Sequence, residues 1–140
     1  SEKNGIKFHG SISSHDVKSK ILSSSILLHV ESLDDFYFDR IKYSFSTKIP
    51  ESLASGKCFF VYGPKGAASI DYLIKNEAAC VVTNKNLLEE KIFEVIDNKE
   101  LRKFYIKNAL QLAKRNHNPK NNYDKFKNIL FDVADKYENR

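Results

Sequence analysis

The sequence has 140 residues, of which 41% are hydrophobic and 12% aromatic, a composition typical of a globular domain and unlike a disordered chain. No apolar run approaches the roughly 20 residues that a helix needs to span a bilayer, and no N-terminal pattern indicates a signal peptide. The two cysteines lie in predicted strands without the spacing of metal ligands, which favours buried, reduced thiols and a cytoplasmic location.

The net charge of +5 is unevenly distributed along the chain. Residues 98–140 contain eleven Lys and Arg residues against five Asp and Glu residues, so the positive excess lies in the C-terminal part. Such a tail is either a surface for nucleic acid or for an anionic membrane, or the solvated face of lysine-rich helices. Because the sequence has no nucleic-acid motif and no interleaving of aromatic and basic residues, we favour the solvated face and predict no nucleic-acid partner.

The N-terminal part predicts a strand, a helix and a second strand. Apolar and polar residues alternate enough over residues 6–12 to predict a strand, which Gly10 ends. A serine at position 13 or 14 then caps a helix that continues to about Ser23. Residues 26–30 are mostly apolar and predict the next buried strand.

The connection over residues 31–43 is acidic and aromatic, and we predict it to be a loop. Connections of this length in compact domains are often functional. The adjacent Asp34 and Asp35 suggest a metal site or a general base, but neighbouring acids more often only solvate a loop, so we assign them no role. His29 precedes this connection at the carboxyl edge of the expected sheet, where α/β proteins bind ligands, so it is a candidate contact; we favour a structural histidine over this role.

The next stretch predicts a loop, a short helix and a buried strand. The side chain of Ser46 or Thr47 can cap the helix, and Pro50 falls within its first four positions, where a missing N–H costs nothing. Gly56 supplies the left-handed residue that commonly ends a helix. Residues 58–62 are apolar at every position, as expected for a strand buried on both faces of a parallel sheet.

The remaining elements continue the alternation of strand and helix. After a turn at residues 63–66, the pattern predicts a helix to about Asn76 and a strand over residues 79–83. Three helices follow: one from Asn84 or Asn86 to about Ile96, one over about 99–115, and a last amphipathic helix within 118–140. The alternation predicts a Rossmann-like α/β/α fold of three layers, with a parallel sheet of about four strands in a single domain spanning residues 1–140.

The start of the short helix also has the chemistry of an anion site. Free amides and the dipole point toward its N-terminus, and Lys48 adds a cation. Glu51, one turn further on, can accept hydrogen bonds from a diol. In the alternative interpretation Thr47 is only a cap and Glu51 only offsets the dipole. The turn after the following strand matches neither phosphate-binding fingerprint, although Lys65 can approach a phosphate from it.

The segment STKIPESLASGK at residues 46–57, followed by an apolar strand, resembles the donor-binding core of GT-B glycosyltransferases, especially family 4. Members often read S-x-K-x-x-E-x-L-A-x-G-K-P-V there. The resemblance implies that Ser46, Thr47 and Lys48 bind the donor diphosphate and that Glu51 binds the ribose. Two positions depart from the pattern: Tyr43 replaces a second Glu that many members carry, and Cys58 replaces the Pro. The strand–Gly–x–Val start of the family is similar to residues 6–12, which implies that Ser11 and Ile12 lie against the nucleobase.

The resemblance further implies a retaining enzyme that transfers a sugar from a nucleotide-diphosphate sugar to a glycan or other acceptor, typically in polysaccharide biosynthesis and without a metal in this part. The chain would be a partial C-terminal domain, inactive alone, because the acceptor-binding N-terminal domain and the first two strands are not in the sequence. We therefore expect either a homodimer that pairs exposed sheet edges, or a rearranged edge in which the first strand packs directly against the second. We expect the full enzyme to be cytoplasmic, and peripheral contact with the inner face of the membrane is a further possibility for it. The alternative is a non-catalytic, flavodoxin-like interaction domain with a basic C-terminal helix.

Overall fold

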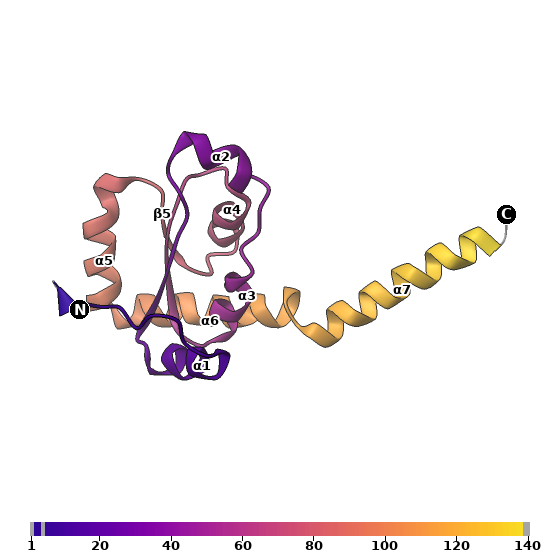
Figure 1. Ribbon diagram of the computed structural model, residues 1–140, viewed down its shortest axis with the longest axis horizontal. Helices are drawn as coiled ribbons and strands as arrows, with labels where there is room; N and C mark the ends of the chain where they lie inside the picture. The colour runs from indigo at the N-terminus through magenta and orange to yellow at the C-terminus, as the bar shows by residue number, and fades with distance from the viewer. Residues whose placement is uncertain (1, 4, 139–140) are drawn as a thin grey trace.

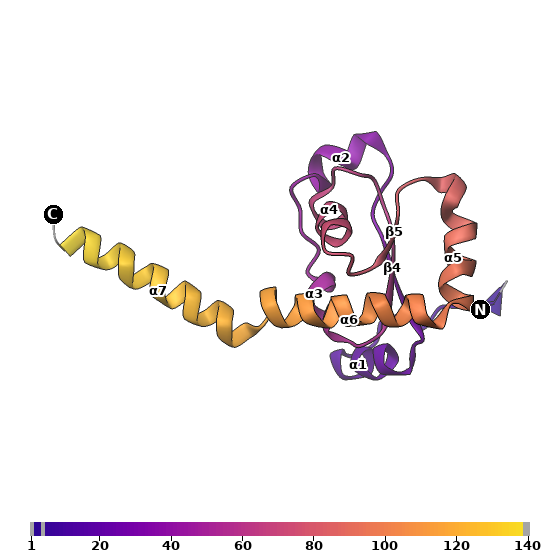
Figure 2. The same ribbon diagram turned by 180° about the vertical axis from the view of Figure 1, so that it is seen from behind.

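The computed structural model describes residues 2–3 and 5–138, and Figures 1 and 2 show it from two sides. Its strands are β1 (Glu2–Lys3), β2 (Ile6–Lys7), β3 (Ile26–Val30), β4 (Cys58–Tyr62) and β5 (Cys80–Val82). Its helices are α1 (Ser14–Ser23), α2 (Asp35–Ile41), α3 (Lys48–Ala54), α4 (Ala68–Lys75), the 3-10 turn η1 (Lys85–Leu87), α5 (Leu88–Asp97), α6 (Lys99–Asn116) and α7 (Pro119–Glu138).

The centre of the fold is a parallel sheet with the strand order β3-β4-β5. Ile26 of β3 pairs with Cys58 of β4, and Phe60 of β4 pairs with Cys80 of β5. Parallel neighbours joined by helices confirm the predicted Rossmann-like α/β architecture. The sheet has three strands among the described residues, where about four were expected.

Two hydrophobic clusters lie on the two faces of this sheet. On one face, Phe59 and Val61 of β4 pack against the apolar sides of α3 and α4, which contribute Ile49, Leu53, Ile70 and Leu73. On the other face, Phe60 and Cys80 pack against Val95 of α5. α6 runs across the strands, so its first half belongs to the second cluster and its second half, with Ala109 and Leu112, belongs to the first.

The prediction of a sheet strand at residues 6–12 is wrong. Only Ile6–Lys7 is extended, and it pairs antiparallel with Glu2–Lys3 in a separate two-stranded hairpin. Gly5 makes the tight turn with a φ of +76°, and Gly10 has a φ of +69°, which interrupts an extended backbone. A strand needs a neighbour, and no described strand pairs with the outer edge of β3.

The prediction that residues 31–43 form a loop is also wrong, because α2 lies within them. The Asp34 side chain caps this helix by accepting a hydrogen bond from the Phe36 amide at 2.9 Å. Phe38 approaches Gly66, where an added Cβ would lie 3.3 Å from the Phe38 ring. Asp34 is therefore a helix cap, which explains the acidic residue without a catalytic role.

The other predicted elements are confirmed to within a few residues. Ser13 caps α1, since its hydroxyl accepts a hydrogen bond from the Asp16 amide at 3.2 Å. Pro50 is the third residue of α3, and Gly56 follows that helix with a φ of +71°. Asn84 caps the turn that leads into α5. α6 ends at Asn116, and α7 then extends away from the rest of the molecule.

Candidate functional site

A pocket of about 360 Å³ lies between α1, β3 and α3. α3 leads into β4, so it runs opposite to the strands and its first residues lie toward the carboxyl edge of the sheet. Ligands of parallel α/β sheets bind at this edge. The residues that line the pocket are Val17, Ile21, Leu27, Leu28, His29, Lys48, Glu51 and Ser52.

The polar wall of the pocket comes mainly from one side of α3. Lys48, Glu51 and Ser52 are spaced three and four residues apart, which places them on the same face of the helix. The Ser52 hydroxyl donates a hydrogen bond to the Lys48 carbonyl at 3.0 Å, so this hydroxyl is held to its own helix. Lys48 and Glu51 thus present one cation and one carboxylate to the same space.

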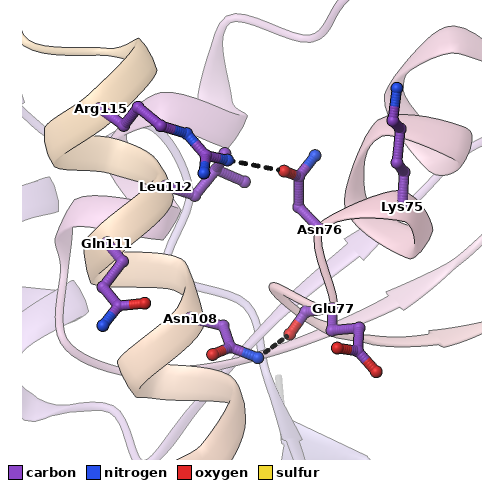
Figure 3. A pocket seen from close by; sticks show the side chains of 7 residues that line it. All are labelled: Lys75, Asn76, Glu77, Asn108, Gln111, Leu112 and Arg115. Atoms are coloured by element: carbon purple, nitrogen blue, oxygen red, sulfur yellow. Dashed lines mark hydrogen bonds between the residues drawn. The ribbon is translucent and has the colours of Figure 1, made fainter.

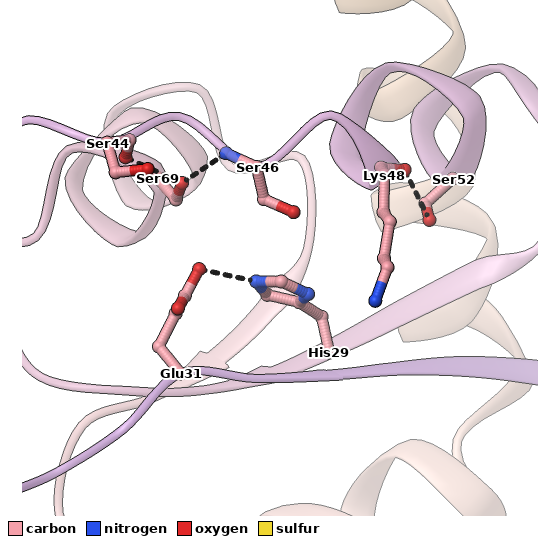
Figure 4. Close-up of polar contacts among 7 residues, drawn as sticks. All are labelled: His29, Glu31, Ser44, Ser46, Lys48, Ser52 and Ser69. Carbon is pink, nitrogen blue, oxygen red and sulfur yellow. Dashed lines mark hydrogen bonds and ion pairs between the residues drawn. The ribbon is translucent and has the colours of Figure 1, made fainter. Parts of the chain in front are cut away.

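The opposite wall carries an ordered histidine. Nε2 of His29 lies 2.9 Å from Oε1 of Glu31, and the two side chains are only 12% and 18% exposed. Figure 4 shows Lys48 extending from α3 toward the strand beside the His29 ring, with the Ser46 hydroxyl on the same side. Glu31 engages Nε2, and Figure 4 shows the other ring nitrogen on the side of Lys48.

The loop that leads into α3 is fixed by a buried serine. Ser69, only 1% exposed, donates a hydrogen bond to the Ser44 carbonyl at 3.2 Å and accepts one from the Ser46 amide at 3.1 Å (Figure 4). Two hydrogen bonds from α4 therefore hold the backbone on both sides of Phe45. A rigid loop favours a preorganised site.

Phe45 itself anchors the same loop to the end of α6. Its ring centre lies 5.1 Å from that of Tyr72 and 5.9 Å from that of His117. The Tyr72 hydroxyl lies 2.9 Å from Nε2 of His117, and burial lowers the pKa of this histidine. A neutral imidazole suits this packed position.

The prediction that the side chain of Ser46 or Thr47 caps α3 is wrong. Thr47 occupies the N-cap position with helical angles, φ −64° and ψ −14°, and its side chain makes no capping hydrogen bond. A cap hydroxyl reaches the first-turn amides only from an extended backbone. The Ser46 carbonyl instead accepts the Ile49 amide hydrogen at 3.1 Å.

Comparison with known proteins then gives the family. A model of the family described as glycosyl transferase-like matches residues 1–128. The chain belongs to this glycosyl transferase-like family. Searches of curated proteins and of solved structures found no match. Membership confirms the resemblance to glycosyltransferases carried by residues 46–57, indicates transferase activity, and favours a glycosyltransferase domain over a non-catalytic interaction domain.

The structure brings together some of the site residues predicted for this glycosyltransferase domain and leaves others apart. Lys48, Glu51 and His29 line one pocket, and Ser46 and Thr47 lie in the loop at its edge. Ser11 and Ile12 lie in the exposed segment before α1, and Lys65 lies in the exposed turn after β4; none of these three lines the pocket.

Sequence reasoning missed Glu31 and Ser69. Glu31 could have been found, because residues two apart on an extended chain face the same side and Glu31 follows His29 at that spacing. Ser69 left no signal, since the loop that it holds lies more than twenty residues away in the sequence.

A second pocket, of about 260 Å³, lies between the end of α4 and α6 (Figure 3). Two hydrogen bonds cross it: Arg115 donates to the Asn76 side-chain oxygen at 2.9 Å, and Asn108 donates to the Glu77 carbonyl at 3.0 Å. α4 returns the chain from β4 to β5, so this pocket lies toward the amino ends of the strands. Its contacts join two helices, and its position is opposite to the edge where α/β ligands bind.

Neither a metal cluster nor a membrane-spanning helix is found in the part of the chain that the structure describes. No group of three or more His, Cys, Asp and Glu residues there could hold a metal ion. None of the helices there is long and apolar enough to cross a bilayer. The absence of a metal cofactor remains a prediction.

Proposed function

We propose that the pocket between α1, β3 and α3 binds the nucleotide-diphosphate part of a sugar donor, within an enzyme that transfers the sugar to a glycan or other acceptor. The observation that carries the proposal is the pairing of Lys48 and Glu51 on one face of α3, opposite His29 at the carboxyl edge of the sheet. The volume of about 360 Å³ lies within the range of small-molecule sites and suits part of such a donor.

Each polar group has a role that follows from its charge. Lys48 attracts the diphosphate, with Ser46 and Thr47 beside it as further donors. Glu51 accepts hydrogen bonds from the two hydroxyls of the ribose. His29, oriented by Glu31, supplies a further polar contact on the opposite wall.

Ser11, Ile12 and Lys65 complete the proposed site at its margins. Ser11 and Ile12 lead into α1, whose Val17 lines the pocket, so they are placed to approach the base of a bound nucleotide. Lys65 follows β4, the strand next to His29, and serves as a second cation for the phosphates.

The proposed chemistry is electrostatic. Departure of a nucleoside diphosphate develops negative charge on the leaving oxygen, and cations held in place stabilise that charge. Retention of configuration, a cytoplasmic site of action in surface-glycan assembly and inactivity of these 140 residues alone belong to the same proposal. Measurable sugar transfer by the purified chain would contradict the last of these.

A nuclear magnetic resonance titration of the isotope-labelled chain with UDP, GDP and pyrophosphate tests the site. We expect millimolar binding, about 4 kcal/mol, with shifts at His29 and at residues 46–51. Lys48→Ala should weaken all three ligands about tenfold, because a charged hydrogen bond is lost. Glu51→Gln should weaken only the two nucleotides.

The second pocket provides matched controls. Lys75→Ala and Glu77→Gln make the same chemical changes there and should leave nucleotide affinity unchanged. Shifts confined to this second pocket, or no shifts up to tens of millimolar nucleotide, would overturn the proposed site.

A further inference from the structure

Ser69 is a polar side chain at a fully buried position. It is the second residue of α4 and only 1% exposed, and no other polar side chain in the described part of the chain is buried to this degree. The residue before it is Ala68, and alanine has the higher helix propensity. Burial of a hydroxyl also costs a desolvation free energy that its hydrogen bonds roughly offset. The Ser69 hydroxyl therefore adds little net stability, and its consequence is geometric.

The start of α4 holds the chain before α3 at alternate residues. The Ala68 amide donates a hydrogen bond to the Lys42 carbonyl at 2.9 Å. The Ser69 hydroxyl donates to the Ser44 carbonyl at 3.2 Å and accepts from the Ser46 amide at 3.1 Å. Three hydrogen bonds from two adjacent residues of α4 thus fix the backbone at positions 42, 44 and 46.

The contact at Ser46 continues into the first turn of α3. Ser46 donates its amide hydrogen to Ser69, and its carbonyl accepts the Ile49 amide hydrogen at 3.1 Å. With both backbone groups engaged, the bond from Cα to Cβ of Ser46 has one fixed direction. Figure 4 shows the Ser46 hydroxyl pointing toward the His29 ring, into the space that Lys48 also enters. Within the described residues this hydroxyl has no hydrogen-bond partner.

We propose that Ser69 is a positioning residue of the donor site, which orients the Ser46 hydroxyl toward the phosphates of the donor without touching them. The proposal rests on the function proposed for the pocket beside α3. A donor group whose backbone is fixed before the ligand arrives loses less conformational entropy on binding. Without the Ser69 hydroxyl, the Ser44 carbonyl and the Ser46 amide would bond to water, because Ser44 is exposed and Ser46 half-buried. The loop would then sample more conformations.

A second contact holds the same loop but does not set the direction of Ser46. The Phe45 ring packs against Tyr72 and His117, which fixes the place of the loop through the side chain of the preceding residue. A ring contact tolerates rotation of the peptide unit that follows it, whereas Ser69 bonds to the Ser46 amide itself. We therefore expect the chain to stay folded without the Ser69 hydroxyl, with the loop in place and Ser46 misdirected.

Titration of the isotope-labelled chain with pyrophosphate, followed by nuclear magnetic resonance, tests the proposal. Ser69→Ala should weaken pyrophosphate binding about fivefold, the effect of one hydrogen bond, although Ser69 does not contact the ligand. Ser46→Ala should weaken binding by a similar factor. Because Ser69 acts through Ser46, the double variant should also lose only about fivefold, whereas independent effects would multiply to about 25-fold.

Ser55 provides a matched control at the other end of α3. Its hydroxyl also donates to a backbone carbonyl, that of Ser52 at 2.6 Å, and accepts from a backbone amide, that of Lys57 at 3.1 Å. Ser55→Ala removes the same pair of hydrogen bonds away from the loop of Ser46, and should leave pyrophosphate affinity unchanged. An equal loss of affinity in Ser55→Ala would mean that affinity follows general stability, and would overturn the proposal.

Hydrogen exchange tests the same contact in the unaltered chain. Relative to its intrinsic rate, the Ser46 amide should exchange at least about tenfold more slowly than the Thr47 amide, which has no acceptor in the described structure. Ser69→Ala should remove this protection. Equal exchange of the two amides, unchanged affinity in Ser69→Ala, or multiplied losses in the double variant would overturn this proposal alone. Absence of pyrophosphate binding by the unaltered chain would overturn the donor site together with it.

Discussion

β3 and β4 are strands of five residues each, and both are mostly apolar, but their burial differs greatly. The first four residues of β4 are 0% to 2% exposed, whereas Leu28 and Val30 of β3 are 69% and 56% exposed. β4 has a strand on each side and a hydrophobic cluster on each face. β3 has one strand beside it among the described residues. Burial therefore depends on a strand's neighbours more than on its own residues.

The largest expected difference between the two strands is in thiol reactivity. Burial, and then the neighbouring Cys80, raises the pKa of the Cys58 thiol on β4 from 9.0 to about 11. A raised pKa keeps the thiol protonated, so at pH 8 its reactive thiolate is about a hundredfold rarer than that of an ordinary cysteine. We expect a cysteine placed on β3 by Leu28→Cys to react at least about a hundredfold faster than Cys58, and also faster than Cys80, whose pKa burial likewise raises.

A chromogenic thiol reagent at pH 8 measures these rates. The folded variant should show one fast thiol, and all three thiols should react quickly in urea. Fast reaction of Cys58 and Cys80 in the folded protein would show that the interior around β4 is open to solvent.

The next largest effect is on stability, and the same substitution, valine to alanine, compares the two strands. Val61→Ala on β4 removes two buried carbon atoms from a residue that is 0% exposed, and should lower the free energy of unfolding by about 2 kcal/mol. Val30→Ala on β3 should change it by less than about 0.5 kcal/mol. Urea unfolding followed by circular dichroism measures both, and equal losses would mean that β3 is covered in solution.

The smallest of the three effects concerns how the chain enters each strand. Gly56 leads into β4 with a φ of +71°, and a Cβ added there would meet nothing within 4 Å. Gly56→Ala should therefore cost only the strain of a left-handed backbone, about 1 kcal/mol. Ser25→Ala, at the exposed entry to β3, is the control and should be nearly neutral. A much larger loss at Gly56 would indicate a steric conflict.

The features that could be predicted from the sequence are those set by local chemistry. The apolar run at 58–62 and the glycine after α3 mark β4 and its entry whatever surrounds them. Lys48 and Glu51 share a helix face by spacing alone, so their meeting in one pocket could be anticipated.

The features that could not be predicted depend on residues that are distant in the sequence. Residues 6–12 alternate like a strand, but their place in a sheet depends on a pairing partner that alternation does not reveal. α2 has only seven residues, too few for a clear helical period, although Asp34 is a good cap. The anchoring of Ser46 by Ser69 required the packed structure.

The path of α6 across the sheet has a consequence for how the protein is made. Leu101 and Tyr105 complete the cluster on one face, and Ala109 and Leu112 complete the cluster on the other. A nascent chain on the ribosome can pair all three parallel strands before α6 has been synthesised, but both clusters then still lack the apolar side chains that α6 contributes. The growing chain would expose a chaperone-binding surface until residues 99–116 emerge, and both clusters would then close in one cooperative step.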